Sequence, residues 1–117
     1  MKTTKLQCNF ASNLYYCESN KYSDFTEMLK KKFPAIKDEF NDDGSDFNGE
    51  TQTISYKDTR YYYIWARKRT NQIIYHEVLH VCLRIAEYIG LPTTANTSEF
   101  LTYLQEDLVE QIKKINK

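Results

Sequence analysis

The segment from Arg60 to Arg67 constrains the fold most, because an extended chain there is apolar on both of its sides. One side of this strand carries Tyr61, Tyr63 and Trp65, and the other carries Tyr62, Ile64 and Ala66. A strand of this kind is usually buried on both faces or covered by helices. A second strand is predicted from Thr51 to Tyr56, and the residues between the two, Lys57-Asp58-Thr59, form the turn.

The second half of the chain predicts two long amphipathic helices. The first follows a cap at Thr70 or Asn71 and continues to about Ile89, where a glycine and then a proline end it. The second covers about residues 97–115. Apolar side chains recur at helical spacing in both helices: Ile74, Val78, Val81, Ile85 and Tyr88 in the first, and Leu101, Leu104, Leu108, Ile112 and Ile115 in the second.

The first half of the chain predicts a strand, a helix and a loop. Residues 5–17 are short and rich in aromatic side chains, which favours a strand. A helix follows a cap at Ser23 or Asp24 and stops before Pro34, and residues 41–49 form an exposed loop. The order of elements therefore predicts one α+β domain over the whole chain of 117 residues, with a small antiparallel or mixed sheet.

The first long helix contains His76-Glu77-Val78-Leu79-His80, an H-E-x-x-H motif that holds both histidines of the chain. Side chains at positions i and i+4 lie one turn apart on one side of a helix, so both imidazoles reach a single zinc ion. Glu77 is angled away from that ion and is expected to deprotonate a water on it. Alternatively, the two histidines pack against their neighbours and Glu77 is solvated.

A catalytic zinc site needs a third protein ligand and one open position. Glu99 is the candidate, because the eighteen residues that separate it from His80 contain a helix end and a turn. The last helix would fold back so that its first turn approaches the motif. In the alternative, Glu99 is the capping-box partner of an N-cap at Asn96. Glu106 or Asp107, about two turns further along, could serve as the ligand instead.

The motif His76-Glu77-x-x-His80, followed by eighteen residues and Glu99, resembles the gluzincin pattern of zinc metallopeptidases such as thermolysin-like enzymes and alanyl-type aminopeptidases. The resemblance covers about residues 60–107. It implies that His76, His80 and Glu99 bind zinc, that Glu77 is the base, and that the reaction is peptide-bond hydrolysis. It also implies that the strand from Arg60 to Arg67 is the edge strand that pairs with substrate.

The stretch from Tyr75 to Tyr103 also resembles small zincin-like proteins of phages and prophages. They share the motif helix and a following Asn/Ser-Glu-x-x-x-Tyr segment, which here runs from Ser98 to Tyr103. This is the closer resemblance, because it fits the length of the chain as well as the motif. It implies a minimal zincin-like domain with a small sheet, an active-site helix and a C-terminal helix that carries the third ligand.

Tyr103 stands four residues after Glu99, where thermolysin-like enzymes carry an Asp that supports a ligand histidine. A phenol forms a hydrogen bond but brings no charge to an imidazole. Tyr103 is therefore a candidate to polarise a substrate carbonyl, with support of a ligand or plain packing as the alternatives. Arg84 lies one turn beyond His80, where a solvated helix charge is favoured over a role at an oxyanion.

Composition argues against several classes of function. Lys+Arg and Asp+Glu both total 16, and the resulting net charge of zero gives no general attraction to nucleic acid or anionic membranes. No apolar run approaches the roughly 18 residues of a membrane span. The three cysteines, Cys8, Cys17 and Cys82, are irregularly spaced, and no signal peptide is evident. These features predict a reduced, cytoplasmic protein, in the host cytoplasm if it is phage-encoded.

Two functions remain as hypotheses. In the first, the chain is a zinc metallopeptidase that hydrolyses peptide bonds with a water activated by Glu77, and its partner is a peptide or protein substrate. In the second, it is a non-catalytic zinc-binding domain of phage origin that binds another protein as a regulator or inhibitor.

Overall fold

The computed structural model describes residues 1–40, 47–92 and 94–116. Its centre is a four-stranded sheet in the order β1-β2-β4-β3. The strands are β1 (Lys2–Lys5), β2 (Leu14–Glu18), β3 (Gly49–Tyr56) and β4 (Thr59–Ala66). The two middle strands, β2 and β4, pair in parallel, whereas β1 pairs with β2 and β3 with β4 in antiparallel fashion. The sheet is therefore mixed, and the prediction of an α+β fold is confirmed.

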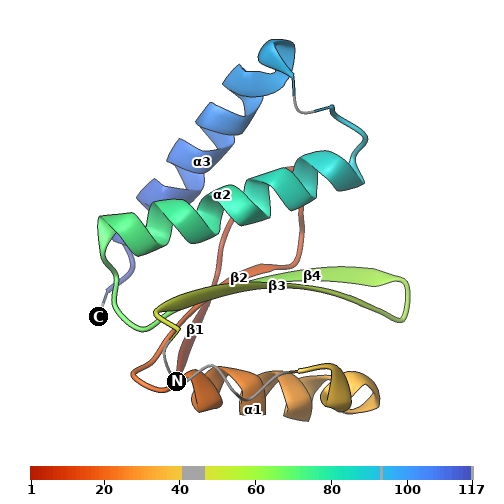
Figure 1. Ribbon diagram of the computed structural model, residues 1–117, viewed down its shortest axis with the longest axis vertical. Helices are drawn as coiled ribbons and strands as arrows, with labels where there is room; N and C mark the ends of the chain where they lie inside the picture. Colours follow the sequence, from red (N-terminus) through yellow and green to blue (C-terminus); the bar gives the residue numbers. More distant parts are fainter. Residues whose placement is uncertain (41–46, 93, 117) are drawn as a thin grey trace.

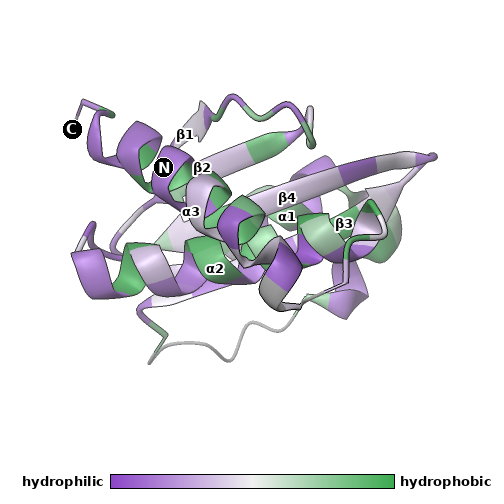
Figure 2. Ribbon diagram, turned by 90° about the horizontal axis from the view of Figure 1, so that it is seen from above, coloured by the Kyte–Doolittle hydropathy of each residue, from purple (hydrophilic) through white to green (hydrophobic). Residues whose placement is uncertain are grey.

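Helices cover both faces of this sheet (Figure 1). Helix α1 (Tyr22–Lys32) lies on one face, and α2 (Asn71–Tyr88) and α3 (Ser98–Lys113) lie on the other. Two short 3-10 helices, η1 (Pro34–Glu39) and η2 (Ala95–Thr97), follow α1 and precede α3. Seen from above, α2 and α3 each carry both hydrophobic and hydrophilic residues (Figure 2), as helices between a core and solvent do.

Strand β4 is central in the sheet, and both of its faces are covered, as the sequence predicts. Every residue from Tyr62 to Ala66 is buried. One face packs against an aromatic core with Phe25 and Phe33, and the other against an aliphatic core with Val78 and Leu108. The expectation that β4 is an edge strand is wrong, because β2 and β3 pair with its two sides, and the strands at the two edges of the described sheet are β1 and β3.

The elements on either side of the motif form for local reasons that the sequence makes visible. Thr70 caps α2, since its hydroxyl accepts a hydrogen bond from the backbone N–H of Ile73 at 3.3 Å. The helix is followed by Gly90, whose φ of 82° favours glycine. In the β3–β4 turn, Lys57 and Asp58 both have positive φ, the conformation that matches the twist of a two-residue hairpin.

The N-terminal part of the chain differs from its prediction. Residues 5–17 do not form one strand, because β1 ends at Lys5 and β2 begins at Leu14. The residues between them form a loop that buries Leu6 and Ala11 in the aliphatic core. Helix α1 begins at Tyr22, before the predicted caps, and stops before Pro34 as predicted. Most of the predicted 41–49 loop, residues 41–46, lies outside the described residues.

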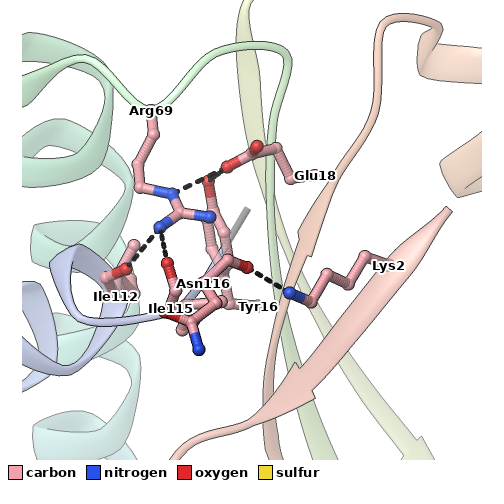
Figure 3. Close-up of polar contacts among 7 residues, drawn as sticks. All are labelled: Lys2, Tyr16, Glu18, Arg69, Ile112, Ile115 and Asn116. Atoms are coloured by element: carbon pink, nitrogen blue, oxygen red, sulfur yellow. Dashed lines mark hydrogen bonds and ion pairs between the residues drawn. The ribbon is translucent and has the colours of Figure 1, made fainter.

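Arg69, just before the cap of α2, joins three elements in a buried polar cluster (Figure 3). Its Nε donates to Glu18 Oε1 at 2.9 Å, and Nη1 donates to the carbonyl of Ile112 at 3.2 Å and to that of Ile115. The hydroxyl of Tyr16 donates to the same Glu18 oxygen at 2.7 Å. The Arg69 cluster therefore ties the start of α2 and the end of α3 to β2.

The remaining sequence expectations concern thiols and membranes. Cys8, Cys17 and Cys82 are free. Burial raises the pKa of the Cys17 thiol to about 11 and that of Cys82 to about 12, so both are protonated at neutral pH. None of the helices in the described part of the chain combines the length and the apolarity that a membrane crossing requires.

Candidate metal centre

The exposed side of α2 brings His76 and His80 together, one helical turn apart. Their Nε2 atoms lie 3.2 Å from each other, and the ring planes meet at 85°. Two nitrogens that share a tetrahedral zinc ion, each at 2.0–2.1 Å, are separated by about 3.3–3.4 Å. The same distance also fits a hydrogen bond between the rings. Because both histidines are exposed, the pair has the spacing and the access that a shared metal ion requires.

Glu77 has the opposite environment, because its side chain lies against β3. The residue is only 7% exposed. The hydroxyl of Thr51 lies 2.9 Å from Glu77 Oε1 and 3.1 Å from the Glu77 carbonyl, and both oxygens accept from it. The other carboxylate oxygen, Oε2, is 3.9 Å from Nε2 of His76. The strand thus holds one oxygen of the carboxylate and leaves the other beside the histidine pair.

Gly49 allows β3 to approach α2 this closely. A Cβ atom at Gly49 would lie 2.8 Å from Cγ2 of Ile73, 3.0 Å from Cγ of Glu77 and 3.2 Å from its Oε2. Carbon atoms in proteins do not pack at 2.8 Å without moving, so a larger residue would push the strand and helix apart. The absence of a side chain at position 49 therefore helps Thr51, two residues later, to reach Glu77.

A groove of about 710 Å³ lies between β3 and α2. The helix side is formed by Glu77, His80 and Arg84. The strand side includes the small residues Gly49, Thr51, Thr53 and Ser55, which share one face of β3. Since these four side chains are short, they leave the space that the groove occupies.

The backbone of β3 offers hydrogen-bonding groups along this groove. The backbone N–H of Arg67 donates to the carbonyl of Asn48 at 2.9 Å, which fixes the alternation of the antiparallel β3–β4 ladder. Gly49 and every second residue after it therefore direct their backbone N–H and C=O away from β4. Among the described strands β3 is at the edge of the sheet, so these groups face the unpaired side.

Glu99 lies in a different place from the histidine pair. It is an exposed residue in the first turn of α3, and this turn stands away from α2 in Figure 1. The helix begins at Ser98 with Thr97 in the cap position, and Thr97 makes no side-chain cap hydrogen bond. Asn96 and Glu99 therefore do not occupy the N-cap and N3 positions of a capping box.

Tyr103 also lies apart from the groove. Tyr103 is 64% exposed, and it lines a separate hollow together with Phe10 and Phe100. Among the side chains of residues 1–40, 47–92 and 94–116, no three His, Cys, Asp or Glu residues gather closely enough to hold a metal ion. The structure places His76, His80 and Glu77 side by side on α2 and keeps Glu99 and Tyr103 apart from them, and the metal-binding and catalytic roles of all five stay predictions.

Three contributors to this region were missed by the sequence analysis: Gly49, Thr51 and Arg60. All come from the β3–β4 hairpin, before the motif in the chain. The alternation of small residues at 49, 51, 53 and 55 was a visible signal, because it marks one open face of a strand. Which helix would lie over that face could not be read from the alternation.

Comparisons of the chain with protein-family models, with curated proteins and with solved structures found no match. The functional argument therefore rests on the chemistry and geometry of the site.

Proposed function

We propose that this chain is a zinc-dependent metallopeptidase-like protein that acts on peptide bonds. The observation that carries the proposal is the 3.2 Å separation of the His76 and His80 Nε2 atoms, with Glu77 Oε2 beside them at 3.9 Å from His76 Nε2. A helix that presents two imidazoles and one immobilised carboxylate at such distances supplies two of the three ligands, and the base, of a hydrolytic zinc site.

In this proposal His76 and His80 hold the zinc ion, with Glu99 as the predicted third ligand. A bound zinc ion supplies Lewis-acid chemistry, which polarises a carbonyl group and makes water nucleophilic near neutral pH. The near match between 3.2 Å and the spacing of two tetrahedral ligands supports the pair as ligands. Exposure of both rings supports access for a substrate.

Glu77 moves the proton in this proposal. Its Oε2 accepts a proton from the attacking water and then gives it to the departing amine, which is general base followed by general acid catalysis. The hydroxyl of Thr51 holds Oε1 at 2.9 Å and so limits rotation of the carboxylate. A base held in one orientation loses little conformational freedom in the reaction, which favours the transition state.

Strand β3 orients the substrate. The outward backbone groups of Thr51, Thr53 and Ser55 have the spacing to pair with an extended peptide, which would add a strand to the sheet edge. That strand would lie in the groove between β3 and α2, with a peptide bond beside Glu77.

The three free thiols fit the proposed cytoplasmic location.

A second candidate is a non-catalytic zinc-binding domain of phage origin that binds a protein partner. It is favoured by the absence, among the described residues, of a third metal-binding side chain gathered with the histidine pair. In this case the metal would complete its coordination with a group on the partner, and β3 would supply the contact surface.

The substitution Glu77→Gln tests the first function against the second. The amide keeps the shape of the carboxylate and still accepts from Thr51, but it takes up no proton. Zinc content, measured by mass spectrometry, should be unchanged, and cleavage of a broad peptide library should fall by about 10²- to 10⁴-fold. A wild-type protein that binds zinc and cleaves nothing would exclude the peptidase and leave the binding domain.

A further inference from the structure

The end of the groove farthest from Glu77 is positively charged. Arg60 and Arg84 both line it, whereas the carboxylate of Glu77 lines the opposite end. Strand β3 and helix α2 run in the same direction, because Thr51 contacts Glu77 near the start of each and Arg60, paired with Ser55, contacts Tyr88 near the end. The groove therefore has an acidic end and a basic end.

Arg60 is held in place without a neutralising carboxylate. Its Nε donates to the hydroxyl of Tyr62 at 2.7 Å, and its guanidinium lies 4.4 Å from the ring centroid of Tyr88 and 5.4 Å from that of Tyr62. Across residues 1–40, 47–92 and 94–116, no carboxylate lies within ion-pair distance of Arg60. Two aromatic rings and one hydroxyl thus fix a positive charge and leave its terminal N–H groups for another acceptor.

Arg84 adds a second positive charge, and its ion pair within the chain is easily displaced. Its nearest carboxylate is Glu87, at 3.8 Å, and both side chains are more than half exposed. An exposed ion pair one turn apart on a helix is weak, so a ligand carboxylate competes with it readily. Arg84 also lies one helical turn beyond His80, on the same side of α2 as the groove.

We infer that Arg60 and Arg84 form a carboxylate-binding subsite, so that the groove selects peptides with an acidic group about three residues from the peptide bond beside Glu77. This inference rests on the proposed function for the position of that bond, but binding of the acidic group does not require catalysis. The seven residues from Glu77 to Arg84 span about 10 Å of helix. An extended peptide advances about 3.3–3.4 Å per residue, which gives three residues.

Peptide binding to metal-free protein tests this subsite separately from catalysis. The probes are capped eight-residue peptides of serine and alanine with a neutral rhodamine label, each with one Glu at a different position, and the matched peptides with Gln. A further probe ends in a free carboxylate, which distinguishes a terminal from a side-chain acid. Fluorescence anisotropy at about 50 mM salt should show that one Glu position binds about three- to tenfold more tightly than its Gln match.

The variants Arg84→Gln and Arg60→Gln should each reduce that preference toward one, and the double variant should abolish it. Arg60→Lys keeps the charge and controls for lost packing on Tyr88, and thermal melting verifies that each variant is folded. Lys31→Gln, an exposed cation on α1 across the sheet, changes the net charge equally and should leave the preference intact. Equal binding of all Glu and Gln pairs, or a preference that both Arg variants retain, would overturn the subsite. Loss of cleavage or of zinc binding would count only against the proposed function.

Discussion

Two polar clusters at α2, the Arg69 cluster and the histidine pair, differ in the partners of their hydrogen-bonding groups. In the Arg69 cluster, the guanidinium donates to Glu18 and to the carbonyls of Ile112 and Ile115, all within the chain. In the candidate metal centre, the Nε2 atoms of His76 and His80 lie beside each other, and both rings are exposed. The first cluster is satisfied internally, whereas the second keeps its nitrogen atoms within reach of an external ligand.

This difference separates stability from binding capacity. The Arg69 side chain is only 8% exposed, so removal of its partners would leave a charge in a poorly solvated position. The His76 side chain is 67% exposed, so water replaces any partner that it loses. Substitutions in the Arg69 cluster should therefore act on the free energy of unfolding, and substitutions in the candidate metal centre should act on the proposed metal affinity.

The largest effect is expected on metal affinity. His80→Ala removes one of the two imidazoles, and the zinc dissociation constant should rise by about a thousandfold or more, because loss of groups that merely support ligands already changes it by about 10–100-fold. The free energy of unfolding of metal-free protein should change by less than about 0.5 kcal/mol, since the residue is exposed. Competition with a chromophoric chelator measures the affinity, and urea denaturation measures the stability.

The matched control for this experiment comes from the other cluster. Arg69→Ala should retain zinc affinity under conditions in which the protein is folded. Arg69 lies seven residues before His76, and none of the hydrogen bonds of the Arg69 cluster involves a histidine. If His80→Ala bound zinc as tightly as the wild type, the histidine pair would be a hydrogen-bonded surface feature and the proposed centre would be wrong.

The second effect is on stability. Arg69→Ala removes the cation beside Glu18 and one donor to the carbonyls of Ile112 and Ile115, and the free energy of unfolding should fall by about 3 kcal/mol. This value is at the lower end for buried ion pairs, because the Glu18 side chain is 26% exposed. Urea denaturation measures it, and the exposed neighbour Lys68→Ala should stay within about 0.5 kcal/mol of the wild type. A loss no greater than that of Lys68→Ala would contradict a structural role for the cluster.

The sequence predicted the placement of the motif side chains better than the Arg69 cluster, and the reason is distance along the chain. His76, Glu77 and His80 lie within five residues on one helix, so helical geometry alone places them. The helix itself was predictable from its Thr70 cap, which the structure confirms. Arg69 bonds to residues that lie 43 to 51 positions away along the chain, and no local sequence pattern predicts such contacts.

Strand pairing was the part of the fold that the sequence left open. The hairpin of β3 and β4 was predictable, because its turn is local, but the parallel pairing of β2 with β4 joins segments that are distant in the chain. The strand predicted over residues 5–17 included the loop before β2, which no glycine or proline marks, and β1 at Lys2–Lys5 was not predicted. Tyr88 fitted the apolar repeat of α2 but is 63% exposed and stacks on Arg60.

The smallest effect concerns one hydrogen bond in the Arg69 cluster. Tyr16→Phe removes the hydroxyl that donates to Glu18 at 2.7 Å and leaves Arg69 in place as the partner of that carboxylate. At pH 7 the free energy of unfolding should fall by about 1 kcal/mol, the usual contribution of a single hydrogen bond. Urea denaturation of the variant and of the wild type, side by side, measures this difference.

Alkaline pH sharpens the test, because burial raises the pKa of Tyr16 above its usual range and the nearby Glu18 raises it further. Above about pH 10 the tyrosine of the unfolded chain loses its proton while the folded one keeps it. The folded state then binds more protons, so the wild type loses stability as pH rises through this range, by up to about 1.4 kcal/mol per pH unit from this group. The phenyl ring of the variant does not titrate, so the gap between variant and wild type should narrow or reverse above about pH 10. A gap that stays constant from about pH 7 to about pH 11 would mean that Tyr16 is not enclosed with Glu18 and Arg69, and the contrast between a closed cluster and an open one would fail at this residue.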